Sequence, residues 1–312
     1  MSKRTKRISF LILTAFLAVN AVAFFHAYKF THFNKELKAR TADPNKLSAT
    51  QKFKTLLFGV DNPRPVDTEK PTKKYTTLSI NSGDDVLECW SVPVDSALGT
   101  VILFHGYAGN KSTLLEKSNL FNDFGYNTVL VDFAGSGGST GNKTTIGFYE
   151  SDQVKAVMDY VKKTGEQHIV LFGISMGSAA ILKSVYDYRL QPTSIIIECP
   201  FGNMLQTVQA RFKIMNAPSF PLSYFLVFWG GLQNKFNAFK HNPSEYAKAV
   251  NVPVLLLYGM KDIKVSKEEI DLIYTNLKGA KELKLYKDAG HENILEANRK
   301  DWISDVGNFL NK

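Results

Sequence analysis

Short apolar runs alternate with amphipathic helical patterns from residue 74 to the end of the chain. The polar turn 81–85 joins the first two runs, which predicts an antiparallel hairpin. The later runs are almost continuously apolar, as strands of a parallel sheet are when helices cover both of its faces. We therefore predict an α/β domain built on a mostly parallel eight-stranded sheet with helices on both faces. The predicted strands are 75–80, 86–92, 101–104, 128–131, 169–172, 194–197, 254–258 and 283–286.

One segment, residues 200–242, interrupts this alternation. It has no strand pattern, is rich in Phe, Tyr and Trp, and is too long for a simple connection between two strands. We expect a helical insertion that acts as a lid and forms an acyl-binding or aromatic pocket. Two alternatives remain open, namely a helical pair that only covers the sheet and a membrane contact through the apolar stretch 220–229.

The N-terminal segment has a different pattern, because residues 8–25 are apolar with only three polar interruptions. This length is near the lower limit for a helix that spans a bilayer. Four Lys and Arg residues precede the run, an arrangement typical of a signal anchor or a signal peptide with its basic end in the cytoplasm. The run is longer than the apolar part of a typical cleaved signal, so we favour a retained anchor. Cleavage near 21–23 is the alternative.

These patterns predict three parts of the chain. Residues 1–33 form a transmembrane signal anchor or signal peptide, residues 34–73 form a polar, proline-containing linker with one short helix, and residues 74–312 form the α/β domain with its lid insertion at 200–242. The domain is expected on the extracytoplasmic side of a membrane, or secreted or periplasmic if the first segment is removed.

The net charge of +9 is located mostly at the N-terminus. Residues 1–40 hold eight Lys and Arg residues against one acid, which leaves only +2 for the remaining 272 residues. The α/β domain therefore has no basic surface for nucleic acid, and we expect no nucleic-acid partner. The two cysteines, Cys89 and Cys199, have no metal-type spacing and are predicted to be ordinary buried residues of strands.

The strongest chemical signal is Gly173-Ile174-Ser175-Met176-Gly177, which lies between a predicted strand and a predicted helix. This G-x-S-x-G pattern is typical of a nucleophile elbow, a sharp turn that exposes a serine at its tip. Glycines flank the serine because a side chain there would crowd the turn. Ser175 is therefore the candidate nucleophile.

A serine nucleophile needs a histidine as base and a carboxylate that orients the histidine. In this architecture the carboxylate follows the serine along the chain, and the histidine follows the carboxylate. Asp262 and His291 each come just after a predicted strand, at the sheet edge where Ser175 is expected. Glu198 ends the sixth strand and is the alternative acid. Asp132 precedes the serine, so we interpret it as support for the loops of the site.

An oxyanion hole requires backbone N–H donors beside the nucleophile. One is expected from Met176, which follows the serine. The second is expected from Tyr107, in the loop His105-Gly106-Tyr107-Ala108-Gly109 that follows the third predicted strand.

With these residues assembled, residues 74–310 resemble the α/β-hydrolase superfamily. The resemblance rests on four motifs in the expected order, His105-Gly106-x-x-Gly109, Gly173-x-Ser175-x-Gly177, Gly259-x-x-Asp262 and Ala289-Gly290-His291. The chain is most similar to membrane-anchored or exported serine hydrolases of the lipase, esterase and peptidase-like group, close to the Bem46-type proteins. The resemblance implies the α/β-hydrolase fold, with Ser175 as nucleophile, His291 as base, Asp262 as acid, and Tyr107 and Met176 as oxyanion donors.

We therefore expect a serine hydrolase that cleaves a carboxylic ester through an acyl-enzyme, with an apolar, lipid-like acyl substrate and without a cofactor or metal. The same triad would also serve a peptidase or amidase. Two further alternatives are a nonhydrolytic use of the site, as in a lyase or haloperoxidase, and a catalytically silent, membrane-tethered binding protein.

Overall fold

The computed structural model describes residues 2–42, 47–292 and 294–312. Part of the predicted linker, residues 43–46, therefore lies outside the described residues. The chain divides into two compact units. Unit 1 contains Met1–Pro63 and Met204–His241, and unit 2 contains Arg64–Asn203 and Asn242–Lys312. The predicted boundary between linker and α/β domain at residue 74 stays a prediction.

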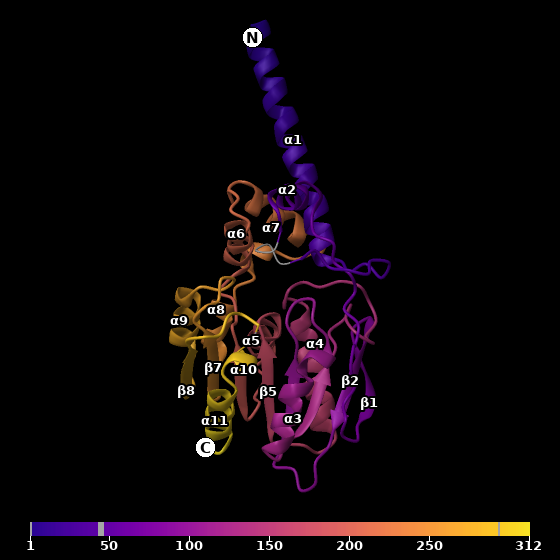
Figure 1. Cartoon of the computed structure of the whole chain (residues 1–312), viewed down its shortest axis with the longest axis vertical. Helices are drawn as coiled ribbons and strands as arrows, with labels where there is room; N and C mark the ends of the chain where they lie inside the picture. Colours follow the sequence, from indigo (N-terminus) through magenta and orange to yellow (C-terminus); the bar gives the residue numbers. More distant parts are fainter. Residues whose placement is uncertain (1, 43–46, 293) are drawn as a thin grey trace. The chain divides into compact units, whose positions relative to one another are not determined.

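Unit 2 is built on one eight-stranded sheet with the strand order β1-β2-β4-β3-β5-β6-β7-β8 (Figure 1). The strand β2 pairs antiparallel with both β1 and β4, and all other neighbours pair parallel. The predicted eight-stranded, mostly parallel sheet is therefore confirmed. The strands are β1 Thr76–Ser82, β2 Asp85–Val92, β3 Thr100–Phe104, β4 Asn127–Val131, β5 Ile169–Ile174, β6 Ser194–Glu198, β7 Val254–Gly259 and β8 Lys281–Tyr286.

Burial explains why the central strands are apolar. Every residue of β3, β6 and β7 is buried, and the same holds for β5 except at its last residue. Successive side chains of a strand point to opposite faces, so both faces of the sheet are covered. The edge strands β1 and β8 are partly exposed and carry more polar residues. The parallel strands β3, β5, β6 and β7 end at one edge of the sheet, and this edge holds the candidate site.

The helices of unit 2 pack on the sheet in two groups. The first group, α3 and α11, lies on the face of the sheet that carries the Phe172 side chain. There the ring centroids of Phe121 (α3) and Trp302 (α11) lie 5.8 Å apart. The helices α4 and α5 form the second group and contact each other. Their bounds, with those of the shorter helices, are α3 Leu115–Asp123, α4 Glu150–Lys163, α5 Met176–Tyr188, α8 Pro243–Tyr246, α9 Lys267–Asn276, α10 Ile294–Ala297 and α11 Arg299–Leu310.

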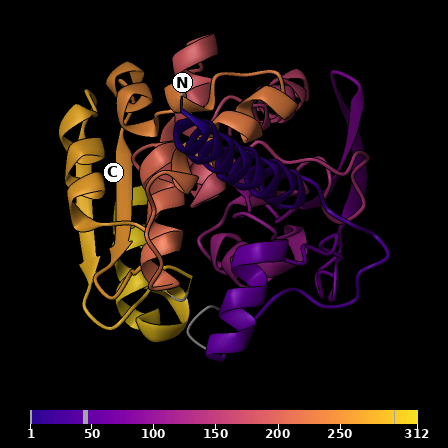
Figure 2. The same ribbon diagram turned by 90° about the horizontal axis from the view of Figure 1, so that it is seen from above.

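Unit 1 contains four α-helices among its described residues, α1 Lys3–Thr31, α2 Ala49–Phe58, α6 Met204–Ile214 and α7 Leu222–Gln233. The insertion after β6 therefore forms helices of its own, as the sequence predicts. The helix α7 packs along α1, and Figure 2 shows the N-terminal helix from above. In the described part of the chain, α1 is the one helix long and apolar enough to cross a membrane; a signal sequence would pass the same test.

Candidate active site

Ser175 lies at the sharp turn between β5 and α5. Its backbone has φ 50° and ψ −105°, a conformation that is strained for a residue with a side chain. Two hydrogen bonds hold this turn: Ser175 N–H donates to the Glu198 carbonyl (2.8 Å), and Ala179 N–H donates to the Ser175 carbonyl (3.0 Å). The surrounding backbone thus fixes a strained serine that points out of the elbow.

The flanking glycines are required by close packing of backbone against backbone. A Cβ atom at Gly173 would lie 2.7 Å from the backbone of Gly177 and Ser178, and one at Gly177 would lie 2.4 Å from the Phe104 carbonyl oxygen. Real Cβ atoms do not approach other atoms so closely. The two glycines therefore allow α5 to begin directly against the ends of β3 and β5.

The structure brings the three predicted catalytic side chains into one hydrogen-bonded chain. Nε2 of His291 lies 2.9 Å from Oγ of Ser175, and Nδ1 of His291 lies 2.6 Å from Oδ2 of Asp262. In the neutral imidazole, Nδ1–H donates to the carboxylate, which leaves Nε2 as the acceptor for the serine hydroxyl. This arrangement can remove a proton from Ser175 and stabilise the imidazolium that results.

The side chain of Asp262 is fully buried and is held as an anion. Its other oxygen, Oδ1, accepts hydrogen bonds from the backbone N–H groups of Lys264 (2.7 Å) and Val265 (3.0 Å). Burial alone raises the pKa of this carboxyl, but the hydrogen bond and charge of His291, together with the two N–H donors, outweigh burial and lower the pKa. The aspartate is therefore ionised at neutral pH.

The alternative acid, Glu198, has other partners. Trp302 Nε1 donates to one carboxylate oxygen (2.8 Å), and Nζ of Lys117 lies 3.5 Å from the other. Glu198 is buried between these two groups and belongs to the packing of the sheet against α3 and α11. The structure places Asp262, and not Glu198, on the histidine.

The loops that carry Asp262 and His291 touch each other through their backbones. Lys261 N–H donates to the Ala289 carbonyl (2.9 Å), and a Cβ atom at Gly259 would lie 2.3 Å from the Gly290 carbonyl oxygen. Glycine at position 259 thus permits the close approach that brings His291 to Asp262.

The predicted oxyanion loop also borders the elbow. A Cβ atom at Gly106 would lie 3.7 Å from Cβ of Ser175, so the loop with Tyr107 runs beside the nucleophile. Met176 is the first residue of α5, where a backbone N–H has no partner inside the helix. Both predicted donors are therefore near the serine, and their role in binding an oxyanion stays a proposal.

The side chain of His105 holds this loop in place through two hydrogen bonds. Phe133 N–H donates to Nε2 of His105 (3.1 Å), so Nδ1 carries the proton and donates to the Gly106 carbonyl (2.8 Å). Burial lowers the pKa of this histidine, which keeps it neutral. It therefore joins the loop after β3 to the loop after β4.

A buried ionic cluster beside this loop was missed by the sequence analysis. The ammonium group of Lys111 is fully buried and pairs with Asp67, Asp132 and Glu88, with 2.8 Å to Glu88. It also lies 4.3 Å above the ring of Trp90. Asp132 further accepts a hydrogen bond from Lys111 N–H (2.7 Å). The prediction that Asp132 supports the loops agrees with these contacts, but no periodic pattern marks Lys111 or Asp67.

Among the described residues, two groups of side chains have the donor types of a metal site. Cys199, Asp262 and His291 place their ligand atoms within 4.8 Å of one another, but Asp262 and His291 bond to each other and burial raises the pKa of the Cys199 thiol well above its usual value. The other group, Asp67, Glu88 and Asp132, encloses the Lys111 ammonium, which occupies the place of a cation.

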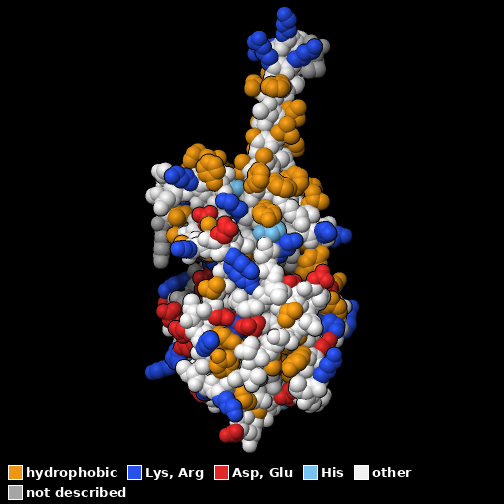
Figure 3. Space-filling view, turned by 90° about the vertical axis from the view of Figure 1, so that its right-hand side faces the viewer, with side chains coloured by type: hydrophobic (Ala, Val, Ile, Leu, Met, Phe, Trp, Pro, Cys, Tyr) orange, Lys and Arg blue, Asp and Glu red, His pale blue; other side chains and the backbone are white. Residues whose placement is uncertain are grey.

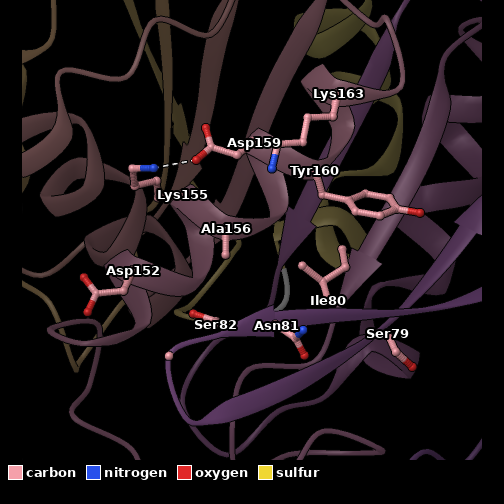
Figure 4. Close-up of a pocket in the computed structure, with 11 residues that line it drawn as sticks. Ser79, Ile80, Asn81, Ser82, Asp152, Lys155, Ala156, Asp159, Tyr160 and Lys163 are labelled. Carbon is pink, nitrogen blue, oxygen red and sulfur yellow. Dashed lines mark hydrogen bonds and ion pairs between the residues drawn. The ribbon is translucent and has the colours of Figure 1, made fainter.

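A hollow of about 500 Å³ lies between α4 and the end of β1 with the turn that follows it (Figure 4). Its lining includes Asp152, Lys155 and Asp159 but no histidine, so it offers no base beside a nucleophile. Lys155 pairs with Asp159, and Tyr188 donates a hydrogen bond to Asp152 (2.7 Å). The chemical arrangement at Ser175 is not repeated there.

Comparison with known proteins gives a consistent assignment. Residues 95–245 match the Hydrolase_4 family model, described as serine aminopeptidase, S33. The chain is 26% identical over 215 residues to the uncharacterized protein YqkD of Bacillus subtilis (strain 168), covering 68% of this chain and 70% of YqkD. It is 23% identical over 179 residues to the lysophosphatidylserine lipase ABHD12 of Macaca fascicularis, covering 54% of this chain and 42% of ABHD12.

Among solved structures, the esterase Pf2001 of Pyrococcus furiosus superposes with a TM-score of 0.67 at 25% identity, covering 80% of this chain and 96% of the esterase. The strand order, the strand-end site and these similarities together show that the chain has the α/β-hydrolase fold and belongs to the α/β-hydrolase superfamily.

Proposed function

We propose that this protein is a serine hydrolase that cleaves a carboxylic ester, with Ser175 as nucleophile, His291 as base and Asp262 as acid. The observation that carries the proposal is the hydrogen-bonded chain from Ser175 Oγ to His291 Nε2 (2.9 Å) and from His291 Nδ1 to Asp262 Oδ2 (2.6 Å), built on a strained elbow. Nucleophile, base and orienting group are the three parts that acyl transfer by serine requires.

The reaction proceeds in two halves. Ser175 Oγ attacks the ester carbonyl carbon while its proton moves to Nε2 of His291, and the resulting oxyanion collapses to release the alcohol, which takes that proton. Water then gives a proton to His291 and attacks the acyl carbon. Collapse returns the proton to Ser175 Oγ and frees the carboxylic acid.

The N–H groups of Tyr107 and Met176 stabilise the negative charge in both halves. Loss of one such donor in comparable sites lowers kcat by about 10²–10³. The packing of Gly106 against Ser175 and the position of Met176 at the start of α5 support this assignment.

The substrate class is an ester with an apolar acyl chain. The aromatic content of the insertion at 200–242 supports its role as a lid with an acyl pocket. Two of the compared proteins are named as an esterase and a lysophosphatidylserine lipase, which favours ester over amide substrates. The apolar α1 supports a membrane anchor, and the four basic residues before it support an extracytoplasmic domain.

A second candidate is a peptidase or amidase that uses the same triad. The description of the matching family model as a serine aminopeptidase favours it. Both candidates share every catalytic residue, so only the substrate separates them.

A substrate panel tests the proposal. The full chain in detergent is assayed with nitrophenyl esters of short, medium and long fatty acids and with aminoacyl nitroanilides, and Ser175→Ala serves as the control. We expect ester hydrolysis that Ser175→Ala abolishes and that rises with acyl length. Hydrolysis of the amides alone would contradict the ester assignment, and ester hydrolysis that persists in Ser175→Ala would contradict the triad.

A further inference from the structure

The outward face of α7 is apolar, although it is exposed. Phe220, which lies just before the helix, and Tyr224, Phe228 and Leu232 follow one another at intervals of four residues, and their side chains are 76%, 42%, 48% and 56% exposed. The helix itself contains no charged residue. A surface helix in water normally turns a polar face outward, so this face requires a partner other than water.

A neighbouring side of α7 packs against α1. The rings of Phe16 and Phe225 lie 5.7 Å apart, and those of Phe24 and Trp229 lie 5.2 Å apart, both edge to face. Trp229 Nε1 donates to the side-chain oxygen of Asn20 (3.2 Å). The pairing therefore involves the part of α1 between residues 16 and 24.

That part of α1 lies within its apolar run. A bilayer core of about 30 Å requires about 20 helical residues at about 1.5 Å each. If α1 enters the core after Arg7, it leaves near Ala27, so the contacts with α7 extend from near the middle of the span into its second half. A helix packed there must lie in the same leaflet. The bond between Trp229 and Asn20 satisfies two polar groups that lipid cannot.

The neighbouring helix α2 also exposes aromatic side chains, together with a basic one. Phe53 and Phe58 are 62% and 67% exposed, and Lys54 is also exposed. Figure 3 shows hydrophobic side chains along α1 and gathered on the helices around its base, with Lys and Arg side chains among them. Exposed Lys235 and Lys240 follow α7. Aromatic and basic residues at one level are typical of a membrane–water interface.

We infer that α7 is embedded in the membrane, with Phe220, Tyr224, Phe228 and Leu232 in contact with lipid acyl chains in the leaflet that holds the second half of α1. The partner of this surface is the lipid bilayer. The inference rests on the proposed anchoring by α1, and the experiment below tests the two separately.

The experiment uses the full chain in phosphatidylcholine–phosphatidylglycerol nanodiscs with one nitroxide label at a time. Phe228→Cys places the label on α7, Phe10→Cys on the span of α1, and Leu272→Cys on the surface of α9, where the native side chain is 51% exposed. Cys89 and Cys199 are buried, so the label reacts with the introduced thiol. The readout is collision of the nitroxide with oxygen, which concentrates in lipid, and with a water-soluble nickel chelate.

We expect the labels at positions 228 and 10 to collide several-fold more with oxygen and several-fold less with nickel than the label at position 272. If the label at position 228 collides with oxygen and nickel as the label at position 272 does, while the label at position 10 is in lipid, the inference for α7 is overturned and the anchor is retained. A label at 10 exposed to nickel overturns both. Low collision with both reagents at 228 overturns the lipid assignment in favour of a protein partner or a second copy.

Discussion

The identity of the catalytic acid is the most direct question at the scale of single residues. We expect Asp262→Asn to lower kcat by about 10⁴ while the fold persists, because an amide no longer holds the imidazole in the tautomer that accepts the serine proton. Steady-state kinetics on a nitrophenyl ester, with circular dichroism as a check of folding, measures this.

Glu198→Gln is the matched control. It removes a buried carboxylate bonded to Trp302 and Lys117, so it should lower stability and leave kcat within about tenfold of the wild type, since it removes no group of the triad. A loss of kcat in Glu198→Gln as large as that in Asp262→Asn would contradict the assignment.

The lowered pKa of Asp262 also predicts how stability depends on pH. In the folded state this pKa lies below the usual value of 3.8, so the ionised carboxylate stabilises the fold above that pH, and the stabilisation is lost as the pH falls through the folded-state pKa. The difference in free energy of unfolding between wild type and Asp262→Asn should therefore shrink below pH 3.8. Urea titrations at several pH values measure it, and a difference independent of pH would refute the expectation.

Ser175, Asp262 and His291 could be selected from the sequence for a topological reason. Each follows a strand that ends at the same edge of the sheet, and the chain order is fixed by the fold. Lys111 could not be selected, because its three carboxylate partners come from separate segments and no sequence period marks a buried ion pair.

At the scale of elements, the contact between the loops that carry Asp262 and His291 depends on the absence of a side chain at position 259. We expect Gly259→Ala to lower kcat by about 10² or more, because a Cβ atom 2.3 Å from the Gly290 carbonyl must displace the loop that carries His291. The ester assay measures the loss.

Gly83→Ala is the control for loss of a glycine. Gly83 lies in the β1–β2 turn at φ 59°, and an added Cβ atom there would have no other atom within 4 Å. The substitution should therefore cost about 1 kcal/mol of stability and leave kcat unchanged. Equal activities of the two variants would show that the close approach at Gly259 does not position His291.

The elements that could be predicted are those with strong local patterns. All eight strands were predicted from local patterns, namely short apolar runs for the buried strands and a polar turn for the hairpin of β1 and β2. Two S/T-x-x-E patterns predict capping boxes at helix starts. The one at Ser266 and Glu269 is confirmed at the start of α9, and the one at Thr113 and Glu116 is wrong. Asn110 begins a 3-10 turn there by accepting a hydrogen bond from Ser112 N–H, and α3 begins only at Leu115.

At the scale of the whole molecule, the central expectation is that α1 anchors the chain. We expect the full chain to stay with membranes after a carbonate wash. Leu13→Lys should release a large fraction of it, because a lysine at the centre of a span costs about 3 kcal/mol. Leu272→Lys on α9 is the control and should release none. Wild-type chain in the soluble fraction would argue against an anchor.

The pairing of α1 with α7 could not be predicted from the sequence. Both helices are apolar nearly all round, so their patterns do not indicate which face packs and which is exposed. The sequence predicted the presence of an insertion with helices, and only the three-dimensional structure indicates the helix with which the insertion pairs.

The proposed mechanism requires Ser175 to be an activated nucleophile, and covalent labelling of this side chain measures its reactivity. A fluorophosphonate probe is added to the full chain in detergent, and the modified peptide is identified by mass spectrometry. We expect one phosphonylated residue, Ser175, with labelling absent in Ser175→Ala and strongly slowed in His291→Ala. No labelling of the folded wild-type chain, or equal labelling of Ser175→Ala, would contradict it.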